Sequence, residues 1–186
     1  MPVIGARLAV DAVHSFLTTS ADPVQSFNDL LSVYRTQESL TAAQFPDVVT
    51  FGKYVYLGSQ QAASGPYLAI EWESSEPETE NNSRLVPHRM ALYLLLQDRD
   101  VSGDEETMFQ RALDYDAVLR AMFLRSTYAA GIGYTLNNGG SGLTTEGRIL
   151  RATIDGASLQ IDTELNTANA LMRWALSVTV IEDYPG

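Results

Sequence analysis

Arg89-Met-Ala-Leu-Tyr-Leu-Leu-Leu-Gln97 has the pattern of a strand that is apolar on both faces, and the predicted fold is built around it. Side chains alternate between the two faces of an extended chain. One face carries Met90, Leu92, Leu94 and Leu96, and the other carries Ala91, Tyr93 and Leu95. Two apolar faces are typical of a strand in the middle of a sheet with cover on both sides. We therefore expect a central strand here.

A long helix is predicted directly after this strand, from about Asp104 to Arg125. Ser102-Gly-Asp-Glu105 has the spacing of a capping box, and acidic residues fill the first turn. The main apolar stripe consists of Met108, Ala112, Tyr115, Leu119 and Met122, and Phe109, Leu113 and Phe123 widen it. A stripe at this spacing predicts a helix packed against the sheet.

Two further helices are predicted before the first strand. The first runs from Gly5 to about Thr18, and its apolar stripe is Leu8, Ala9, Ala12, Val13, Phe16 and Leu17. The second begins at Asp22-Pro23, with aspartate as the N-cap and proline at the first helical position. Its expected buried face is Val24, Phe27, Leu30, Leu31 and Tyr34.

The other strands follow from alternating patterns. We expect a strand or short hairpin after Asp47, a half-buried strand at Pro66–Glu73 with Leu68, Ile70 and Trp72 on one face, and strands at 131–136 and 148–154. A turn is predicted at Asp155-Gly156, followed by a short piece around Leu159 and Ile161. In the closing strand Met172–Glu182, the expected inward residues are Met172, Trp174, Leu176, Val178 and Val180.

Together these elements predict an α+β fold. A mixed, mainly antiparallel sheet packs with an N-terminal helix or helix pair and with one long helix after the central strand. The 186 residues, 45% of them hydrophobic, predict a single domain, 1–186. Polar residues without large apolar side chains predict extended loops at 74–83 and 137–142.

Composition excludes several classes of site. The chain has no cysteine, so it cannot form disulfides or thiolate metal sites. Its net charge is −11, which argues against binding nucleic acid through a basic patch. The start lacks the pattern of a signal peptide, and no apolar run is long enough to span a membrane. We therefore expect synthesis in the cytoplasm and no membrane partner.

No motif in the sequence predicts catalysis, a cofactor or a metal site. The two histidines, His14 and His88, do not have metal-binding spacing, and the glycine-rich segments match neither a nucleophile elbow nor a dinucleotide fingerprint. Two clusters of carboxylates are better explained as solvated loop charge than as a glycosidase pair or calcium loop. They are Glu71, Glu73, Glu76, Glu78 and Glu80, and Asp98, Asp100, Asp104, Glu105 and Glu106.

The order of these elements resembles the tail terminator, or tail completion, proteins of tailed bacteriophages. The resemblance rests on the helix from Gly5, the strands Tyr67–Glu73 and Arg89–Gln97, the helix after Ser102-Gly-Asp-Glu, and the strand at Trp174-Ala-Leu-Ser-Val-Thr-Val. Residues 36–62 and 74–83 look like additions to the usual smaller subunit. The family works through its surfaces, so the resemblance implies no catalytic residue.

What the resemblance implies is a structural protein of the virion, located in the tail or neck. Six copies would form a ring on the head-proximal end of the tail, terminate the tube and join it to the neck. The implied partners are other copies, the tail tube protein and the neck or connector proteins, while genomic DNA passes through without specific binding. The loops supply the expected contact residues Glu76, Glu78, Glu80, Asn81, Asn137, Asn138, Gly139 and Gly140.

Other functions remain open from the sequence alone. Within the same class, the chain could be another neck or head-completion protein, or a tail adaptor. In a different class, it could be a small acidic hydrolase that uses the carboxylates of the 71–106 region. A host-side binding module is a third alternative. Association with particles would favour the first class, and activity lost on substitution of a single Asp or Glu would favour the hydrolase.

Overall fold

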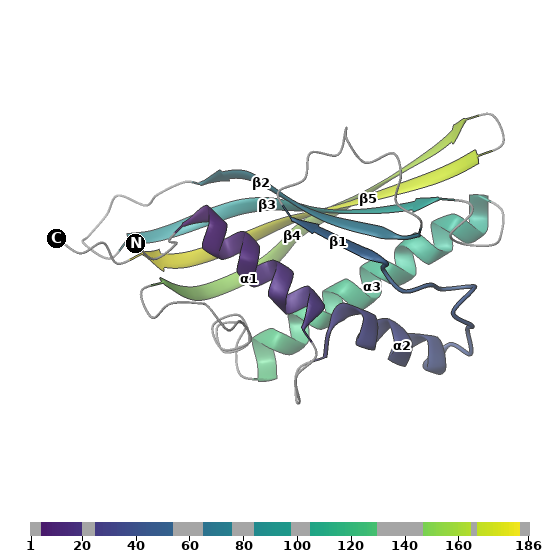
Figure 1. Cartoon of the computed structure of the whole chain (residues 1–186), viewed down its shortest axis with the longest axis horizontal. Coiled ribbons are helices and arrows are strands. Elements are labelled where there is room, and N and C mark those ends of the chain that lie inside the picture. The colour runs from purple at the N-terminus through teal and green to yellow at the C-terminus, as the bar shows by residue number, and fades with distance from the viewer. Residues whose placement is uncertain are drawn as a thin grey trace.

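Three helices lie on one face of a five-stranded sheet in the computed structural model, which describes residues 5–19, 25–53, 65–75, 84–97, 105–129, 147–164 and 167–182 (Figure 1). The elements in chain order are α1 (Ala6–Thr18), α2 (Phe27–Gln37), β1 (Thr50–Lys53), β2 (Tyr67–Ser75), β3 (Arg84–Gln97), α3 (Glu105–Ala129), β4 (Gly147–Glu164) and β5 (Thr167–Glu182). The predicted α+β class is confirmed.

The strand order is β1-β2-β3-β5-β4, which places β3 in the middle as expected. The β1–β2 pair is parallel, and the other three pairs are antiparallel. β3 pairs with β5 along its whole length, from Arg84 opposite Glu182 to Gln97 opposite Asn169. The strand is longer than predicted, because it begins at Arg84 instead of Arg89.

The helices cover the face of the sheet that carries the even-numbered residues of β3. Met90, Leu92, Leu94 and Leu96 are buried there in one cluster with residues from all three helices. The same cluster holds the five predicted inward residues of β5 and the main stripe of α3, which confirms both sets. Phe123 is also buried as predicted, but Phe109 and Leu113 are exposed, so the expected width of the stripe was wrong.

The opposite face of the sheet has no helix among the described elements. Ala91 and Ala69 are buried on that face, whereas Tyr93 and Leu95 are partly exposed. Cover was predicted on both sides of β3, and among the described residues it is found on one side only. Small or polar residues from β5 lie on this second face beside β3, including Arg173 opposite Tyr93 and Ala175 opposite Ala91.

The two N-terminal helices were predicted, but the start of the second was not. Ser26 is the N-cap of α2: its side chain accepts from the Asp29 backbone N–H, and the Asp29 carboxylate accepts from the Ser26 backbone N–H. This capping box gives hydrogen-bond partners to two backbone N–H groups at the start of the helix. The predicted start at Asp22-Pro23 lies outside the described residues. Phe27, Leu30 and Leu31 are buried as expected, and Tyr34 is partly buried.

Two strands differ from the prediction. β2 continues to Ser75, past the predicted loop start at residue 74, and its register with β3 shifts between Trp72 and Ser74. Trp72 lies opposite Met90 yet is 44% exposed. The face of β2 that is fully buried at Leu68 and Ile70 is therefore no longer buried at Trp72. The turn predicted at Asp155-Gly156 is wrong, because β4 continues through these residues. The pairing of β4 with β5 shifts in register between Ile154 and Gly156. Such a bulge keeps a strand continuous while bending it.

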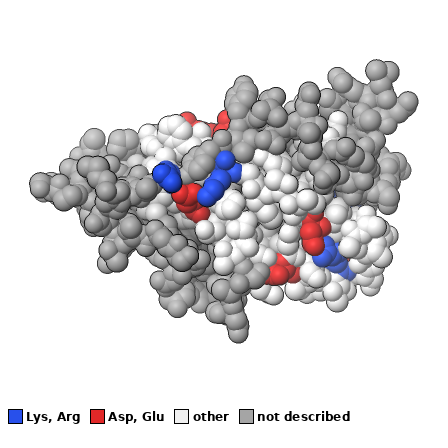
Figure 2. Space-filling model, in the orientation of Figure 1, with Lys and Arg blue, Asp and Glu red and all other residues white. Residues whose placement is uncertain are grey.

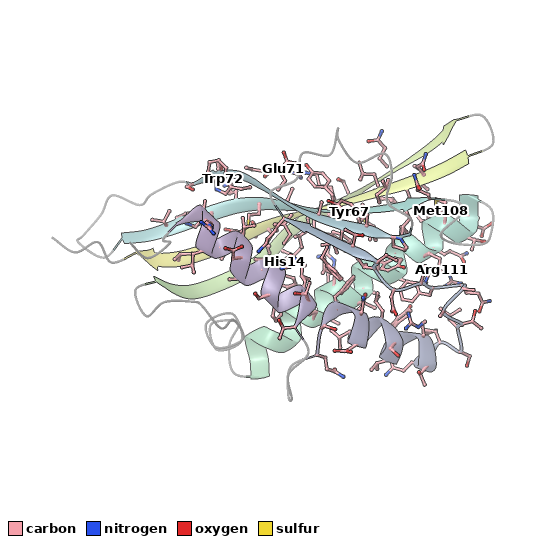
Figure 3. All side chains as sticks on the ribbon, in the orientation of Figure 1. His14, Tyr67, Glu71, Trp72, Met108 and Arg111 are labelled. Carbon is pink, nitrogen blue, oxygen red and sulfur yellow. The ribbon has the colours of Figure 1, made fainter. Side chains whose placement is uncertain are left out.

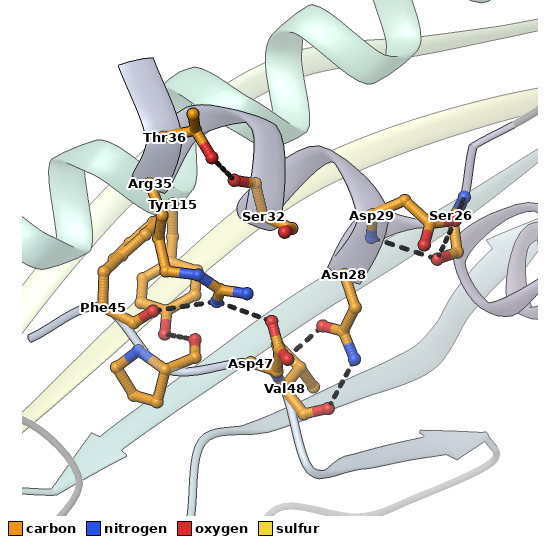
Figure 4. Close-up of polar contacts among 11 residues, drawn as sticks. Ser26, Asn28, Asp29, Ser32, Arg35, Thr36, Phe45, Asp47, Val48 and Tyr115 are labelled. Carbon is orange, nitrogen blue, oxygen red and sulfur yellow. Dashed lines mark hydrogen bonds and ion pairs between the residues drawn. The ribbon is translucent and has the colours of Figure 1, made fainter. Parts of the chain in front are cut away.

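Residues 45–48 are held between α2 and α3 by side chains that sequence patterns did not predict (Figure 4). Asn28 donates to the carbonyl of Val48 and accepts from its N–H, both at 3.0 Å. Arg35 donates to the carbonyl of Phe45, and Tyr115 donates to that of Pro46. The ring of Phe45 is fully buried against Tyr34 and Tyr115. This segment therefore fixes α2 against α3 and leads the chain into β1.

Gly65 marks the entry to β2 at a close approach. Its φ is +118°, a conformation that favours glycine. A Cβ at this position would lie 2.5 Å from Cγ2 of Val49, and the Val49 N–H donates to the Pro66 carbonyl. The absence of a side chain at Gly65 thus lets the start of β1 pack against the start of β2.

Candidate interaction surfaces

The loop residues predicted to contact partners all lie outside the described part of the chain. They are Glu76, Glu78, Glu80, Asn81, Asn137, Asn138, Gly139 and Gly140. The predicted strand at 131–136 and the acidic turn at 98–104 lie outside it as well. The expectation of loop contacts therefore stays a prediction.

The described carboxylates do not gather into a metal-binding group. Within the described ranges, no three His, Asp or Glu side chains are placed to hold a metal ion. From the predicted clusters, Glu73 pairs with Arg173 and Glu106 is exposed near Gln110 on α3. Among the described residues on the face seen in Figure 2, the charged side chains lie in a few small, separated groups.

The two histidines belong to contacts between elements. His14 lies on α1 near β1 (Figure 3), and burial, helped by the charge of Lys53, lowers the pKa of its imidazole. Lys53 itself forms an ion pair with Asp11, 2.9 Å apart, which ties β1 to α1. His88 is buried on β3, and its Nδ1 lies 2.8 Å from the Ser75 hydroxyl of β2. Both side chains support the packing of neighbouring elements.

A cation links three strands on the face without helices. Arg173 of β5 donates to the Tyr93 hydroxyl of β3 at 3.2 Å, and its guanidinium carbon lies 5.8 Å from the centre of the Tyr93 ring. The same guanidinium pairs with Glu73, the residue at the register shift of β2. The bonds to Tyr93 and Glu73 raise the pKa of Arg173. Partly exposed pairs of this kind stabilise a fold little, so this group mainly orients Arg173 and Glu73 on the surface.

The solvent side of α3 carries two large apolar side chains that are exposed in the described residues. Phe109 is 44% exposed and Leu113 is 46% exposed, and Ala117 and Ala121 continue the same line at steps of four residues. Residues four apart are neighbours on a helix surface. We call these four residues the outer ridge of α3. Large exposed apolar side chains grouped in this way are a typical feature of binding surfaces.

Ion pairs and hydrogen bonds separate the outer ridge from the buried side of α3. Asp114 accepts from the Tyr34 hydroxyl at 2.8 Å and pairs with Arg111 at 2.7 Å. Partial burial, together with this hydrogen bond, raises the pKa of Tyr34 to about 12. Asp116 accepts from the indole N–H of Trp174 at 2.6 Å and from Arg120. The carboxylates beside the ridge are therefore occupied by partners within the same chain.

Sequence reasoning placed Phe109 and Leu113 in the core, so it missed the ridge. The signal that could have found it is the distribution of apolar residues around α3. They occupy both the line through Met108, Ala112 and Leu119 and the separate line through Leu113 and Ala117. A helix that is apolar on two sides indicates two contacts.

Comparisons with known proteins add little to this geometry. No protein-family model matches the chain, and no curated protein matches it. Among the solved structures that resemble it is a chain from the structure "Virion of native gene transfer agent (GTA) particle". That chain is 11% identical with a TM-score of 0.38, and the match covers 80% of this chain and 91% of the other. A TM-score this low does not support carrying a role over from that particle.

No helix of the described residues has the length and apolar character needed to cross a membrane. Three candidate contact surfaces in the described ranges are the outer ridge of α3, the face of the sheet without helices, and the exposed part of β2 around Trp72.

Proposed function

We propose that the protein is a structural component of a tailed-phage virion. In this proposal several copies, expected to be six, form a ring at the head-proximal end of the tail. The ring ends polymerisation of the tube and joins the tail to the neck. The protein acts through surfaces and not as an enzyme.

The observation that carries this proposal is the element order, which matches the order on which the family resemblance rests. An N-terminal helix precedes the β2–β3 pair, a long helix follows the central strand, and a long strand containing Trp174 comes after β4 and pairs with the central strand. The exposed apolar side chains support a binding role: Trp72 on β2 and Phe109 on α3 are each 44% exposed, and Leu113 on α3 is 46% exposed.

Ring closure requires two different patches on each subunit that fit one another. We propose that the segments 76–83 and 137–142 supply contacts to neighbouring subunits or to partner rings, through Glu76, Glu78, Glu80 and Asn81 and through Asn137, Asn138, Gly139 and Gly140. Polar segments with few apolar residues can order on contact without contributing to the core.

Imaging tests the proposal directly. The purified protein is examined by negative-stain electron microscopy, and particles from its source are labelled with antibodies raised against the chain. We expect closed rings and label at the junction of head and tail. Absence of the protein from purified particles, or its presence there without rotational symmetry, contradicts the proposal.

A charge variant with a matched control tests the first loop. Glu76→Gln, Glu78→Gln and Glu80→Gln together keep the loop length while removing three charges. We expect impaired head–tail joining with an unchanged melting temperature. The control, Glu38→Gln, alters one exposed carboxylate just after α2 and should leave joining normal. A large loss of thermal stability with normal joining would show that the loop serves the fold instead.

A further inference from the structure

The outer ridge of α3 has features that fit a copy of itself, and we propose that two copies of the protein pair through it. The two α3 helices lie antiparallel across a twofold axis that passes between Leu113 and Ala117. The pair is a state of the free subunit, and it does not depend on where the protein lies in a virion.

The sizes of the ridge residues are complementary in this orientation. Each ridge carries its large side chains, Phe109 and Leu113, toward the N-terminal end and its small ones, Ala117 and Ala121, toward the C-terminal end. A twofold axis between the middle two residues sets Leu113 over Ala117 of the second copy. It also sets Phe109 toward Ala121 of the second copy. Rows of residues four apart are the ridges that most often interlock when helices pack.

The charges beside the ridge favour the same orientation. Glu106 is exposed at the N-terminal end of the ridge, whereas Arg120, which pairs with Asp116 and whose side chain is still 41% exposed, lies near the C-terminal end. Antiparallel pairing brings Glu106 of one copy within about one turn of Arg120 of the other, since a turn rises about 5.4 Å. Parallel pairing would instead set like charges and large side chains against one another. The antiparallel arrangement also aligns the helix dipoles favourably.

This contact differs from the one that closes a ring. A twofold contact uses the same patch on both subunits and is complete with two copies, whereas a ring needs two different patches. The two associations are therefore distinguished by size, because the ridge pair contains two copies and a ring contains more. Failure of one leaves the other unaffected.

A swap of side-chain sizes tests the pairing. Sedimentation velocity over a concentration series measures the dimer dissociation constant for the wild-type chain and for variants in the exposed ridge. Leu113→Ala removes the knob and Ala117→Leu fills the space that receives it, so each should weaken the dimer by about tenfold or more, the scale of losing one buried side chain at an interface. The double variant restores a large residue opposite a small one and should recover most of the affinity.

Val33→Ala provides the matched control, because Val33 is an exposed apolar residue on α2, outside the ridge. This control should leave the dimer unchanged. A wild-type chain that stays monomeric at all concentrations overturns the proposal. So does a dimer that both single ridge variants leave intact, or a double variant weaker than either single one. Circular dichroism confirms that each variant is folded.

Disulfide trapping tests the orientation independently, because the natural chain contains no cysteine. A Leu113→Cys chain is mixed with an Ala117→Cys chain under mild oxidation. Opposed positions close enough for a disulfide have Cβ atoms about 3.5–4.5 Å apart. We expect covalent dimers mainly in the mixture. Efficient crosslinking of Leu113→Cys with itself would indicate a parallel pair and overturn the antiparallel arrangement, and no crosslinking beyond that of a Val33→Cys chain would overturn the contact.

Discussion

The inner and outer sides of α3 carry similar kinds of side chain but have opposite surroundings. On the inner side, Met108, Tyr115 and Leu119 are buried against the sheet and the N-terminal helices. On the outer side, Phe109 and Leu113 are nearly half exposed although they lie one residue from buried positions. Asp114 and Asp116 lie between the two sides and are held by Tyr34, Arg111, Arg120 and Trp174.

Apolar spacing on a helix therefore does not distinguish a contact within one chain from a contact between chains. Both kinds of contact remove apolar surface from water, so both select the same residue types. The polar residues at the boundary are more informative. They form bonds with elements of the same chain on the inner side, and none of the ridge side chains is polar.

The largest expected effect comes from one matched pair of substitutions on α3. Leu119→Ala empties a fully buried site and should lower the free energy of unfolding by about 2–5 kcal/mol. Leu113→Ala, the same change on the outer side, should stay within about 0.5 kcal/mol in dilute monomer. Denaturant unfolding with an unchanged m-value measures both. Equal losses at the two positions would remove the distinction between the sides.

A smaller effect is expected at the boundary with β5. Trp174 is fully buried, and its indole N–H donates to the Asp116 carboxylate at 2.6 Å. Trp174→Phe removes this charge-assisted bond and should lower the free energy of unfolding by about 1.5–3 kcal/mol. Asp116→Asn, which keeps an acceptor for the indole, serves as the control and should cost less. The opposite order would show that the contribution of Asp116 comes mainly through Arg120.

The smallest effect is expected at the boundary with α2, and it depends on pH. The pKa of the Tyr34 hydroxyl is about 12 in the folded chain, against an ordinary 10.0. Because the folded state holds this proton more tightly, the stabilisation is complete below pH 10 and is lost as the pH rises from 10 to 12. Tyr34→Phe should lower stability by about 0.5–1.5 kcal/mol at neutral pH.

The difference in unfolding free energy between wild type and Tyr34→Phe, followed by denaturant titration at a series of pH values, measures this effect. Subtracting the variant removes the contribution of Tyr67, whose pKa burial also raises. We expect the difference to shrink between pH 10 and 12. A difference that stays constant over that range would mean that the bond to Asp114 does not hold the proton.

Much of the fold could be predicted from sequence, because the strongest patterns belong to the most buried elements. The apolar patterns of residues 90–96 and of the closing strand from Met172 correctly predicted where these strands lie and which residues face inward. The stripe from Met108 correctly predicted the buried side of α3. The errors lie where local signals compete. Asp155-Gly156 is a common turn pair, but pairing with β5 on both sides keeps it in a strand. At α2, Ser26 with Asp29 caps the helix four residues after the predicted start.

The surfaces could not be predicted to the same extent. The exposure of Phe109, Leu113 and Trp72 depends on how far neighbouring elements extend, which periodicity does not encode. Likewise, the bonds of residues 45–48 to Asn28, Arg35 and Tyr115 join parts of the chain that are distant in sequence. Such hydrogen bonds depend on the assembled fold, so a local sequence pattern cannot predict them.

The pairing of β3 with β5 has a consequence for how the chain folds during synthesis. β3 meets β2 early, but its other edge pairs with the strand that ends at Glu182. Until that last strand leaves the ribosome, one edge of an apolar strand lacks its native neighbour. Contacts between residues so far apart in sequence slow folding, and unpaired strand edges promote aggregation of the intermediate. A nascent chain stalled before Thr167 should therefore need chaperone protection that the finished protein does not.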